Sequence, residues 1–290
     1  MPDGIVIIDK PQGWTSMDVC AKLRGILHEK RVGHAGTLDP LATGVLPVFV
    51  GQATKAVSFA EDGKKEYIAG LRLGLTTDTQ DVTGKTLSTC PVRITRGELE
   101  AALPRFTGEQ MQLPPMYSAL KVNGRKLCDL ARAGKEAERR PRPVTIYELE
   151  LLEQAGGADY VLRCLCSKGT YLRTLCHDIG EALGCGGAMY SLRRTMAAGF
   201  TLEHAVSVDD VQRQGAAVLL PLDAFFERYP ACVLRSPGKE QRVRNGNSIT
   251  EPALPDGKYR IYAADGAFLC LSEAKGGTLT AVRNFFSYKD

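Results

Sequence analysis

The chain has 290 residues, of which 44% are hydrophobic and 24% are charged, and its formal net charge is +4. This balance is typical of a globular protein with a sizeable core and excludes a disordered or fibrous chain. The sequence has no long apolar run that predicts a membrane span, and its nine cysteines form no CxxC pair, which indicates small buried residues in a reducing cytoplasm rather than a zinc site.

The first hundred residues predict strands and helices in alternation. The apolar stretch 5–8 is too short for a signal peptide and predicts a buried strand. Thr15 and Ser16 predict a helix start, because the apolar residues after them recur at helical spacing. The later elements expected here are strands at 45–50 and 66–73 and a helix that opens on the capping box Thr95-x-x-Glu98.

The middle of the chain predicts a second run of elements. Asn123-Gly124 is a typical hairpin turn, and a short helix at 127–133 is expected to end at Gly134. Strands are expected at 144–152 and 160–166. A helix follows, whose apolar face consists of Leu172, Leu175, Cys176, Ile179 and Leu183.

A change of pattern near residue 229 predicts two domains, 1–229 and 230–290. The second range contains three strand-like runs, which Asp265-Gly266 and Gly276-Gly277 separate, so it predicts a small all-β unit. A range of roughly sixty residues is marginal as an independent domain, and the unit is therefore expected to pack on the main body.

The loop GHAGTLDPLATG, residues 33–44, contains a single aspartate. Pro40 holds Asp39 extended, and Gly33, Gly36 and Gly44 let the backbone approach a ligand closely. No GK[ST] sequence follows, so the loop is not a phosphate-binding P-loop. From this stretch alone, Asp39 belongs either to a surface turn or to a catalytic site.

The stretch SKGTYLRTLCHDIG, residues 167–180, favours the catalytic interpretation. Thr170 is expected to cap a helix, which places Arg173 in the first turn, where a cation opposes the helix dipole. A facing carboxylate makes this placement favourable, and a carboxylate beside an arginine stays ionised as a nucleophile or base. We therefore expect a carboxylate to face Arg173, without a single candidate from this stretch alone, and the alternative is an ordinary surface arginine.

Positive charge is concentrated between residues 121 and 143. Eight Lys or Arg residues there face three acids at 129, 136 and 138, which gives this segment a net charge of +5. Such a segment suits a polyanion such as nucleic acid, although a solvated helix face has the same composition.

Six stretches follow one another along the chain: DKPQGWTS (9–16), GHAGTLDPLATGVLP (33–47), KKEYIAGLRLGLTTDTQD (64–81), PPMYSALKVNGRKL (114–127), SKGTYLRTL (167–175) and SLRRT (191–195). They resemble the motifs of the TruB-type pseudouridine synthases, in particular the bacterial enzymes that modify position 55 of tRNA. Six motifs in order over most of the first 230 residues are far more specific than any one of them. The departures are Ala35, where the family often has a small hydroxyl residue, and His177, where an acid is common.

The resemblance implies a fold and a reaction. The fold is α/β (α+β), with a catalytic domain on a mixed, largely antiparallel sheet and a small C-terminal PUA-type RNA-binding domain. The reaction detaches uracil from C1′ of the ribose, turns it and rejoins it through C5. Because no group is gained and no redox step occurs, neither cofactor nor metal is expected. The expected partner is the tRNA T-arm, without a membrane or an obligate protein partner, for a cytoplasmic monomer.

The resemblance also assigns roles to individual residues. Asp39 carries the essential carboxylate, Arg173 is its basic partner, and Tyr67 is the active-site tyrosine, on which a flipped uracil can stack. The residues expected to contact the flipped nucleotide are His34, Tyr67, Tyr171 and Leu192. The residues expected to contact the RNA backbone are Lys121, Arg125, Lys126, Arg139, Arg140 and Arg142, with Arg193 and Arg194 as additions.

Three functions follow from these patterns. The first is a stand-alone enzyme that isomerises the T-loop uridine, in which Asp39 either adds covalently or removes the ribose 2′ proton. The second is an RNA-binding or RNA-folding module without catalysis, and the third is an RNA-guided relative that modifies ribosomal RNA in a multi-protein particle. The presence of Asp39, Tyr67 and Arg173 favours an enzyme, and the compact length favours the stand-alone type.

Overall fold

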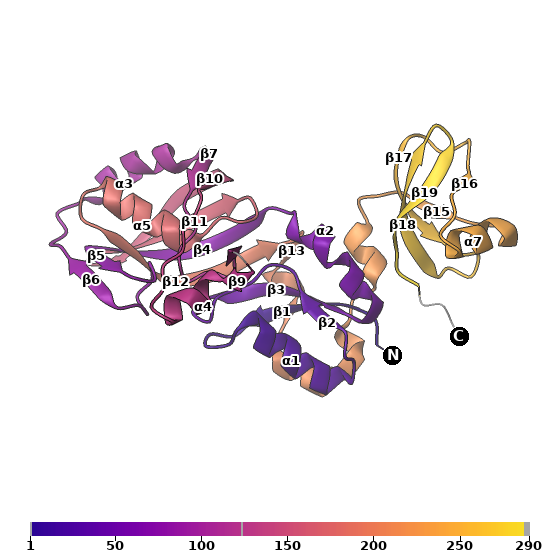
Figure 1. Cartoon of the computed structure of the whole chain (residues 1–290), viewed down its shortest axis with the longest axis horizontal. Coiled ribbons are helices and arrows are strands. Elements are labelled where there is room, and N and C mark those ends of the chain that lie inside the picture. Colours follow the sequence, from indigo (N-terminus) through magenta and orange to yellow (C-terminus); the bar gives the residue numbers. More distant parts are fainter. Residues whose placement is uncertain (1, 123, 287–290) are drawn as a thin grey trace.

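The computed structural model describes residues 2–122 and 124–286. Figure 1 shows an elongated molecule in which a long sheet and its helices form the larger part, and a small β unit forms the carboxyl-terminal end. Within the described ranges, no helix is long and apolar enough to cross a membrane.

A ten-stranded sheet forms the larger part. Its strands are β1 (Gly4–Lys10), β2 (Val32–His34), β3 (Thr43–Val50), β4 (Lys65–Leu73), β7 (Gly108–Gln112), β10 (Arg142–Gly156), β11 (Asp159–Cys166), β12 (Gly187–Ala197), β13 (Phe200–Thr201) and β14 (Ala205–Val206). The central order is β14-β1-β3-β12-β4-β11-β10-β7, with β2 beside β3 and β13 beside β12. Neighbours are antiparallel except β1–β14 and β3–β12, which confirms the mixed, largely antiparallel sheet.

Apolar residues cover both faces of this sheet. On β1, Val6 and Ile8 join one cluster of buried residues, whereas Ile5 and Ile7 join a second cluster on the opposite face. This explains why β1 reads as a continuous apolar run rather than an alternating one. The helices of this part are α1 (Ser16–Leu27), α2 (Val57–Glu61), α3 (Arg96–Ala102), α4 (Leu127–Arg132), α5 (Leu172–Ala182) and α6 (Val208–Gln214).

The helix starts are those predicted in two cases and differ in a third. Thr15 and Thr95 each cap a helix through a full capping box, as expected. The cap of α5 was predicted at Thr170, and this is wrong. The N-cap residue is Tyr171 without a side-chain cap, and the Thr170 hydroxyl donates to the Ser167 carbonyl at 3.0 Å instead.

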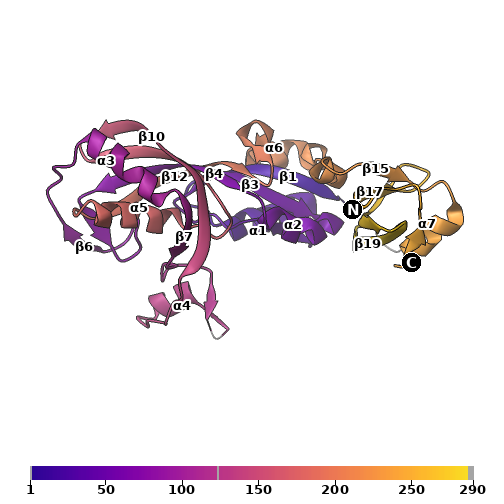
Figure 2. The same ribbon diagram turned by 90° about the horizontal axis from the view of Figure 1, so that it is seen from above.

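Two hairpins stand apart from the large sheet. β5 (Leu75–Thr77) pairs with β6 (Thr86–Thr89), and β8 (Lys121–Val122) pairs with β9 (Arg125–Lys126). The second pair confirms the strands predicted around Asn123-Gly124, although Asn123 itself lies outside the described residues. Figure 2 shows α4, which follows β9, projecting away from the sheet.

The carboxyl-terminal unit is a five-stranded sheet with one helix that the sequence pattern did not predict, α7 (Pro237–Arg244). Its strands are β15 (Ala231–Val233), β16 (Ile249–Thr250), β17 (Gly257–Tyr262), β18 (Phe268–Lys275) and β19 (Thr278–Asn284). Leu271 and Phe285 of this unit join the cluster of Ile5 and Phe226, so the expected packing on the main body is confirmed. The domain limits 1–229 and 230–290 stay a prediction.

Candidate active site

Asp39 lies in the loop between β2 and β3, and the start of α1 holds this loop. The Ser16 hydroxyl accepts from the Leu38 N–H at 2.8 Å and donates to the Leu38 carbonyl at 3.2 Å. On the other side, the Pro40 carbonyl accepts from the Gly13 N–H at 2.7 Å. Both neighbours of Asp39 are therefore anchored, while its own side chain is 40% exposed.

Arg173, in the first turn of α5, is the partner of Asp39. Its Nη2 lies 3.1 Å from Asp39 Oδ2, so the predicted ion pair is confirmed. The same guanidinium donates to the backbone carbonyls of Thr79 at 3.1 Å and Tyr117 at 2.7 Å, and Nη1 lies 3.6 Å from Asp81 Oδ2. Because Arg173 is buried among four oxygens, it has little freedom and fixes the direction of Asp39.

Asp81 is a second, buried carboxylate that the sequence analysis missed. Its Oδ1 accepts from the Thr83 N–H and the Thr79 hydroxyl, both at 2.9 Å. The preceding residue, Gln80, has a φ of 64° and accepts from the Thr174 hydroxyl at 2.8 Å, which ties this segment to α5. In the sequence, Asp81 appears only as the last residue of the stretch TTDTQD, and nothing in that stretch predicts its contact with Arg173.

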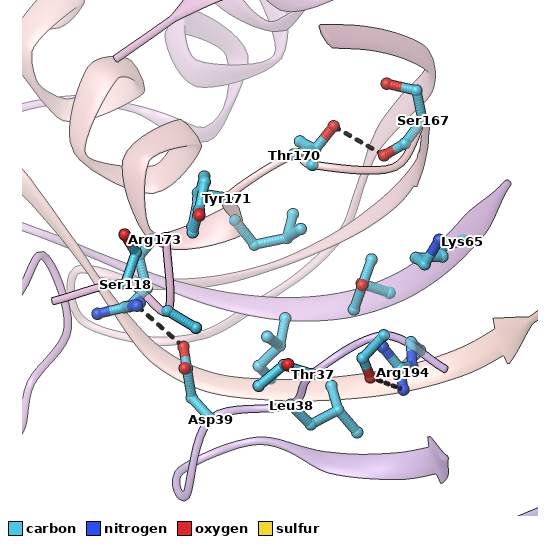
Figure 3. A pocket seen from close by; sticks show the side chains of 16 residues that line it. Thr37, Leu38, Asp39, Lys65, Ser118, Ser167, Thr170, Tyr171, Arg173 and Arg194 are labelled. Atoms are coloured by element: carbon cyan, nitrogen blue, oxygen red, sulfur yellow. Dashed lines mark hydrogen bonds and ion pairs between the residues drawn. The ribbon is translucent and has the colours of Figure 1, made fainter. Parts of the chain in front are cut away.

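Asp39 and Arg173 line a pocket of about 240 Å³ (Figure 3). The pocket is smaller than the roughly 300–1,000 Å³ of common small-molecule sites, so it admits only one compact chemical group. Tyr67 comes from β4, Leu192 from β12 and Tyr171 from the residue before α5, and all three line the same pocket. The fold thus brings together residues far apart in sequence.

The position of α5 follows from close backbone packing. A Cβ atom on Gly180 would lie 2.1 Å from the backbone nitrogen of Gly187, so only glycine lets α5 approach β12 here. This contact, with the apolar face of α5 in the core, carries Arg173 to the pocket.

Tyr67 is 7% exposed and is the cross-strand neighbour of Arg194 on β12. Burial raises the pKa of the Tyr67 hydroxyl, and the positive charge of Arg194 opposes this shift in part. The hydroxyl therefore keeps its proton at neutral pH.

His34 ends β2 and, among the described residues expected to touch the nucleotide, is the one that does not line the pocket. Burial, followed by the charge of Arg194, lowers the pKa of His34, so the imidazole is neutral at physiological pH. Its Nδ1 is buried and has no hydrogen-bond partner among the described residues.

Arg193 and Arg194 were expected to add to RNA backbone contacts, and the structure gives them other partners. Arg193 Nη2 lies 2.8 Å from Asp9 Oδ2. Arg194 is completely buried, and its Nε donates to the Val45 carbonyl at 2.7 Å. Arg194 is therefore not one of the exposed cations that could add to the basic surface, so this expectation is wrong for Arg194.

Arg194 also explains two glycines of the Asp39 loop. Gly36 has a φ of 80°, and a Cβ there would lie 3.2 Å from Arg194 Nη1. A Cβ on Gly44 would lie 2.2 Å from the Arg194 carbonyl oxygen. Gly36 therefore makes room for the buried guanidinium and Gly44 for the close approach of the β12 backbone, and the expectation of a ligand approach foresaw neither.

Lys10 is completely buried beside the same loop. Its Nζ donates to the carbonyls of Trp14 at 2.6 Å and Pro11 at 2.9 Å. Burial lowers the pKa of Lys10 to about 8, and the charge of Asp39 acts in the opposite direction. Lys10 thus anchors the turn after β1 and adds positive charge behind Asp39.

The basic segment 121–143 comprises β8, β9, α4, the stretch after α4 and the first residues of β10. It lies next to a second, open cavity of about 670 Å³. Lys126 is exposed and lines a neighbouring hollow, while Arg139 donates to the Pro114 carbonyl at 3.1 Å. The basic residues that line the larger cavity are Lys121, Arg125, Arg139, Arg140 and Arg142.

The chain matches two family models and a series of curated relatives. Residues 24–172 match the N-terminal domain of the TruB family pseudouridylate synthases, and residues 173–227 match the tRNA pseudouridylate synthase B C-terminal domain. The tRNA pseudouridine synthase B of Dechloromonas aromatica (strain RCB) is 43% identical over 281 residues, 96% of this chain and 93% of that protein. That of Alkaliphilus oremlandii (strain OhILAs) is 46% identical over 256 residues, 88% and 85% of the two chains.

Solved structures show the same fold. A Cbf5–Nop10–Gar1 complex superposes with a TM-score of 0.72 at 26% identity, over 98% of this chain and 85% of that chain. The first family model covers half of the chain, and relatives more than 40% identical span nearly all of it. The chain therefore belongs to the TruB family of pseudouridylate synthases.

Proposed function

We propose that this protein isomerises a uridine to pseudouridine in the T-loop of tRNA, at position 55, with Asp39 as the essential carboxylate. The observation that carries the proposal is the Asp39–Arg173 ion pair on a small pocket that Tyr67, Tyr171 and Leu192 also line. Curated relatives named tRNA pseudouridine synthase B, from 40% to 46% identical, support tRNA as the substrate.

The reaction needs one oriented carboxylate and a pocket that retains the base. Asp39 either adds covalently or removes the ribose 2′ proton, and Arg173 aims it in both routes. The partial exposure of Asp39 gives an entering nucleotide access, whereas the burial of Arg173 keeps the pair rigid. The reaction has no redox step and transfers no group to a second molecule.

The target uridine must leave its stack before it enters the pocket. Base flipping costs a few kcal/mol, and stacking on an aromatic side chain returns about 1–3 kcal/mol per base. Tyr67 supplies such a ring. Because its hydroxyl keeps its proton at neutral pH, stacking is the role that the free protein favours. Neutral His34, outside the pocket, is proposed to occupy the space that the extruded base leaves.

The basic segment 121–143 is proposed to hold the phosphates of the T-arm. It lines an open cavity on the projecting part of the molecule, and its cations are mostly exposed. Binding through phosphates releases counterions, so tRNA affinity is expected to fall steeply with salt.

Two alternatives make different predictions. An RNA-binding or RNA-folding module binds the T-arm without releasing the C5 hydrogen of uridine. An RNA-guided enzyme needs partner proteins and a guide. The name of the Cbf5–Nop10–Gar1 complex gives such partner proteins for Cbf5. The higher identity to the tRNA enzymes favours the stand-alone function.

The decisive experiment measures tritium release from a T-arm stem-loop that carries [5-³H]uridine, with no other protein or guide. The wild-type protein is expected to release tritium, whereas Asp39→Asn binds the RNA and releases none. Asp159→Asn is the matched control, because Asp159 pairs with Arg72 outside the pocket. Near-normal turnover by Asp39→Asn contradicts the role of Asp39, and an inactive wild-type protein contradicts the stand-alone function.

A further inference from the structure

Two buried cations line the pocket without a carboxylate partner. Lys65 is 7% exposed and Arg194 is 0% exposed. Lys65 Nζ donates to the backbone carbonyls of Glu61 at 2.9 Å and Gly63 at 3.0 Å, and Arg194 Nη2 donates to that of Gly36 at 3.0 Å. None of the ion pairs in the described part of the chain includes either residue. A buried charge with neutral partners alone is unfavourable, so this arrangement requires an explanation.

The two cations converge on one point of the Asp39 loop. A Cβ on Gly36 would lie 3.2 Å from Arg194 Nη1 and 3.3 Å from Lys65 Cε. Burial, followed by the nearby charge of Arg194, lowers the pKa of Lys65. Two like charges at one buried place repel each other, and an anion between them would relieve this repulsion.

Both cations still have hydrogen-bond donors to offer. Arg194 Nη1 is buried and meets no acceptor at hydrogen-bond geometry among the described residues. The Lys65 ammonium has three protons, and two of them are used. Figure 3 shows Asp39 and Arg194 at opposite ends of the Thr37–Leu38 segment. A nucleotide whose sugar lies at Asp39 can therefore direct its base toward these donors.

The chemistry of the reaction creates an anion at this end. Breaking the C1′–N1 bond leaves the electron pair on the base, where O2 and O4 share the charge. The base then forms the C1′–C5 bond, loses the C5 proton and gains a proton on N1, so the uracil is again neutral. The negative charge exists only while the base is detached.

We infer that Lys65 and Arg194 hold the detached uracil by donating N–H groups to its carbonyl oxygens and compensating its charge. The inference rests on the proposed function only in placing the target uridine in this pocket. Fixed donors aimed at a charge that develops during the reaction act mainly on kcat, because the neutral bound uridine gains less from them. A contact to a nucleotide phosphate, by contrast, exists before the reaction and acts on KM.

The test is steady-state kinetics of Lys65→Met, Arg194→Met and Arg194→Lys on the T-arm stem-loop. Removing one preorganised donor typically costs about 10²–10³ in kcat, so each Met variant is expected to lose about 10²-fold with little change in KM. Arg194→Lys retains the charge and is expected to recover part of the loss. Arg72→Met is the control, since Arg72 lies on β4 like Lys65 but outside the pocket.

Two outcomes overturn the inference: an unchanged kcat in Lys65→Met, or a raised KM with unchanged kcat in the Met variants, which assigns the cations to a phosphate. Thermal melting identifies a variant that does not fold. Lys65→Met leaves every Arg194 anchor in place, so it carries the test if Arg194→Met is unfolded. Wild-type turnover is measured first, because its absence contradicts the T-loop proposal rather than this inference.

Discussion

Arg173 is surrounded by four oxygens from three separate parts of the chain, and this determines how Asp39 is oriented. Two acceptors are the carboxylates of Asp39 and Asp81, and two are the carbonyls of Thr79 and Tyr117. A planar guanidinium can satisfy such a set, whereas a lysine ammonium reaches fewer of these oxygens. Because α5 is fixed in position, Arg173 is fixed as well, and its ion pair with Asp39 sets the direction of the Asp39 carboxylate.

Arg173→Ala is expected to lower kcat by about 10²-fold, because a 1 Å misplacement of Asp39, the proposed essential carboxylate, costs about that much. RNA affinity is expected to change much less, since Arg173 is buried. Arg173→Lys is the second variant, because it keeps a cation beside Asp81 and avoids an unpaired buried charge. Single-turnover rates and filter binding measure the two effects, and an unaltered rate refutes the positioning role.

At the scale of elements, the helix caps that depend on neighbouring residues were predicted correctly, whereas those that depend on contacts distant in sequence were not. The caps at Thr15 and Thr95 depend on four consecutive residues, so the sequence contained the whole signal. The cap at Thr170 failed because Gln112, on β7, bonds both the N–H and the carbonyl of Tyr171, at 2.8 and 3.1 Å. Such contacts depend on the finished sheet, and no local pattern reports them.

The same limit applies to the candidate site. The helix context predicted that a carboxylate faces Arg173, and the family resemblance identified Asp39 as that carboxylate and placed Tyr67, Tyr171 and Leu192. Burial of Arg194 was missed, because its acceptors on the Asp39 loop and β3 lie about 150 residues away in sequence.

The basic segment 121–143 makes its own prediction at this scale. Reversing Arg139 and Arg140 to Glu together is expected to weaken tRNA binding and flatten its salt dependence, by a slope of about 0.7–0.9 per lost phosphate contact. The control reverses Arg96 and Arg213, which are exposed arginines on α3 and α6, and so changes the net charge equally. Binding isotherms over a salt series measure the slopes. If the slope is unchanged, the segment is a solvated face that does not contact the tRNA phosphates.

At the scale of the whole molecule, the two parts share one aromatic cluster. Phe226 lies before the carboxyl-terminal unit, and its ring centroid is 5.5 Å from that of Phe285 and 6.1 Å from that of Phe268. The small sheet also has its own apolar core around Ile261 and Leu269. The cluster therefore orients the unit on the main body rather than forming its only core.

Phe285→Ala is expected to destabilise this junction by about 3–5 kcal/mol, the usual cost of removing a buried phenylalanine ring. Urea unfolding, followed by intrinsic fluorescence and by circular dichroism, is expected to show the carboxyl-terminal unit unfolding before the large sheet. Val282→Ala on β19, the strand that ends just before Phe285, is the control, because Val282 is 40% exposed. If the two probes give coincident unfolding transitions for Phe285→Ala, and their urea midpoint equals that of the wild-type protein, Phe285 does not stabilise the junction.

The Ser16–Leu38 hydrogen bonds affect how much of the free energy of RNA binding is spent on ordering the Asp39 loop and how much is left for extracting the uridine. Ordering one residue of a flexible loop costs about 1–2 kcal/mol. Because Ser16, Leu38, Gly13 and Pro40 already hold both sides of Asp39, this entropy is lost during folding and not when RNA arrives. More of the favourable contact with tRNA then remains to extract the target uridine from its stack.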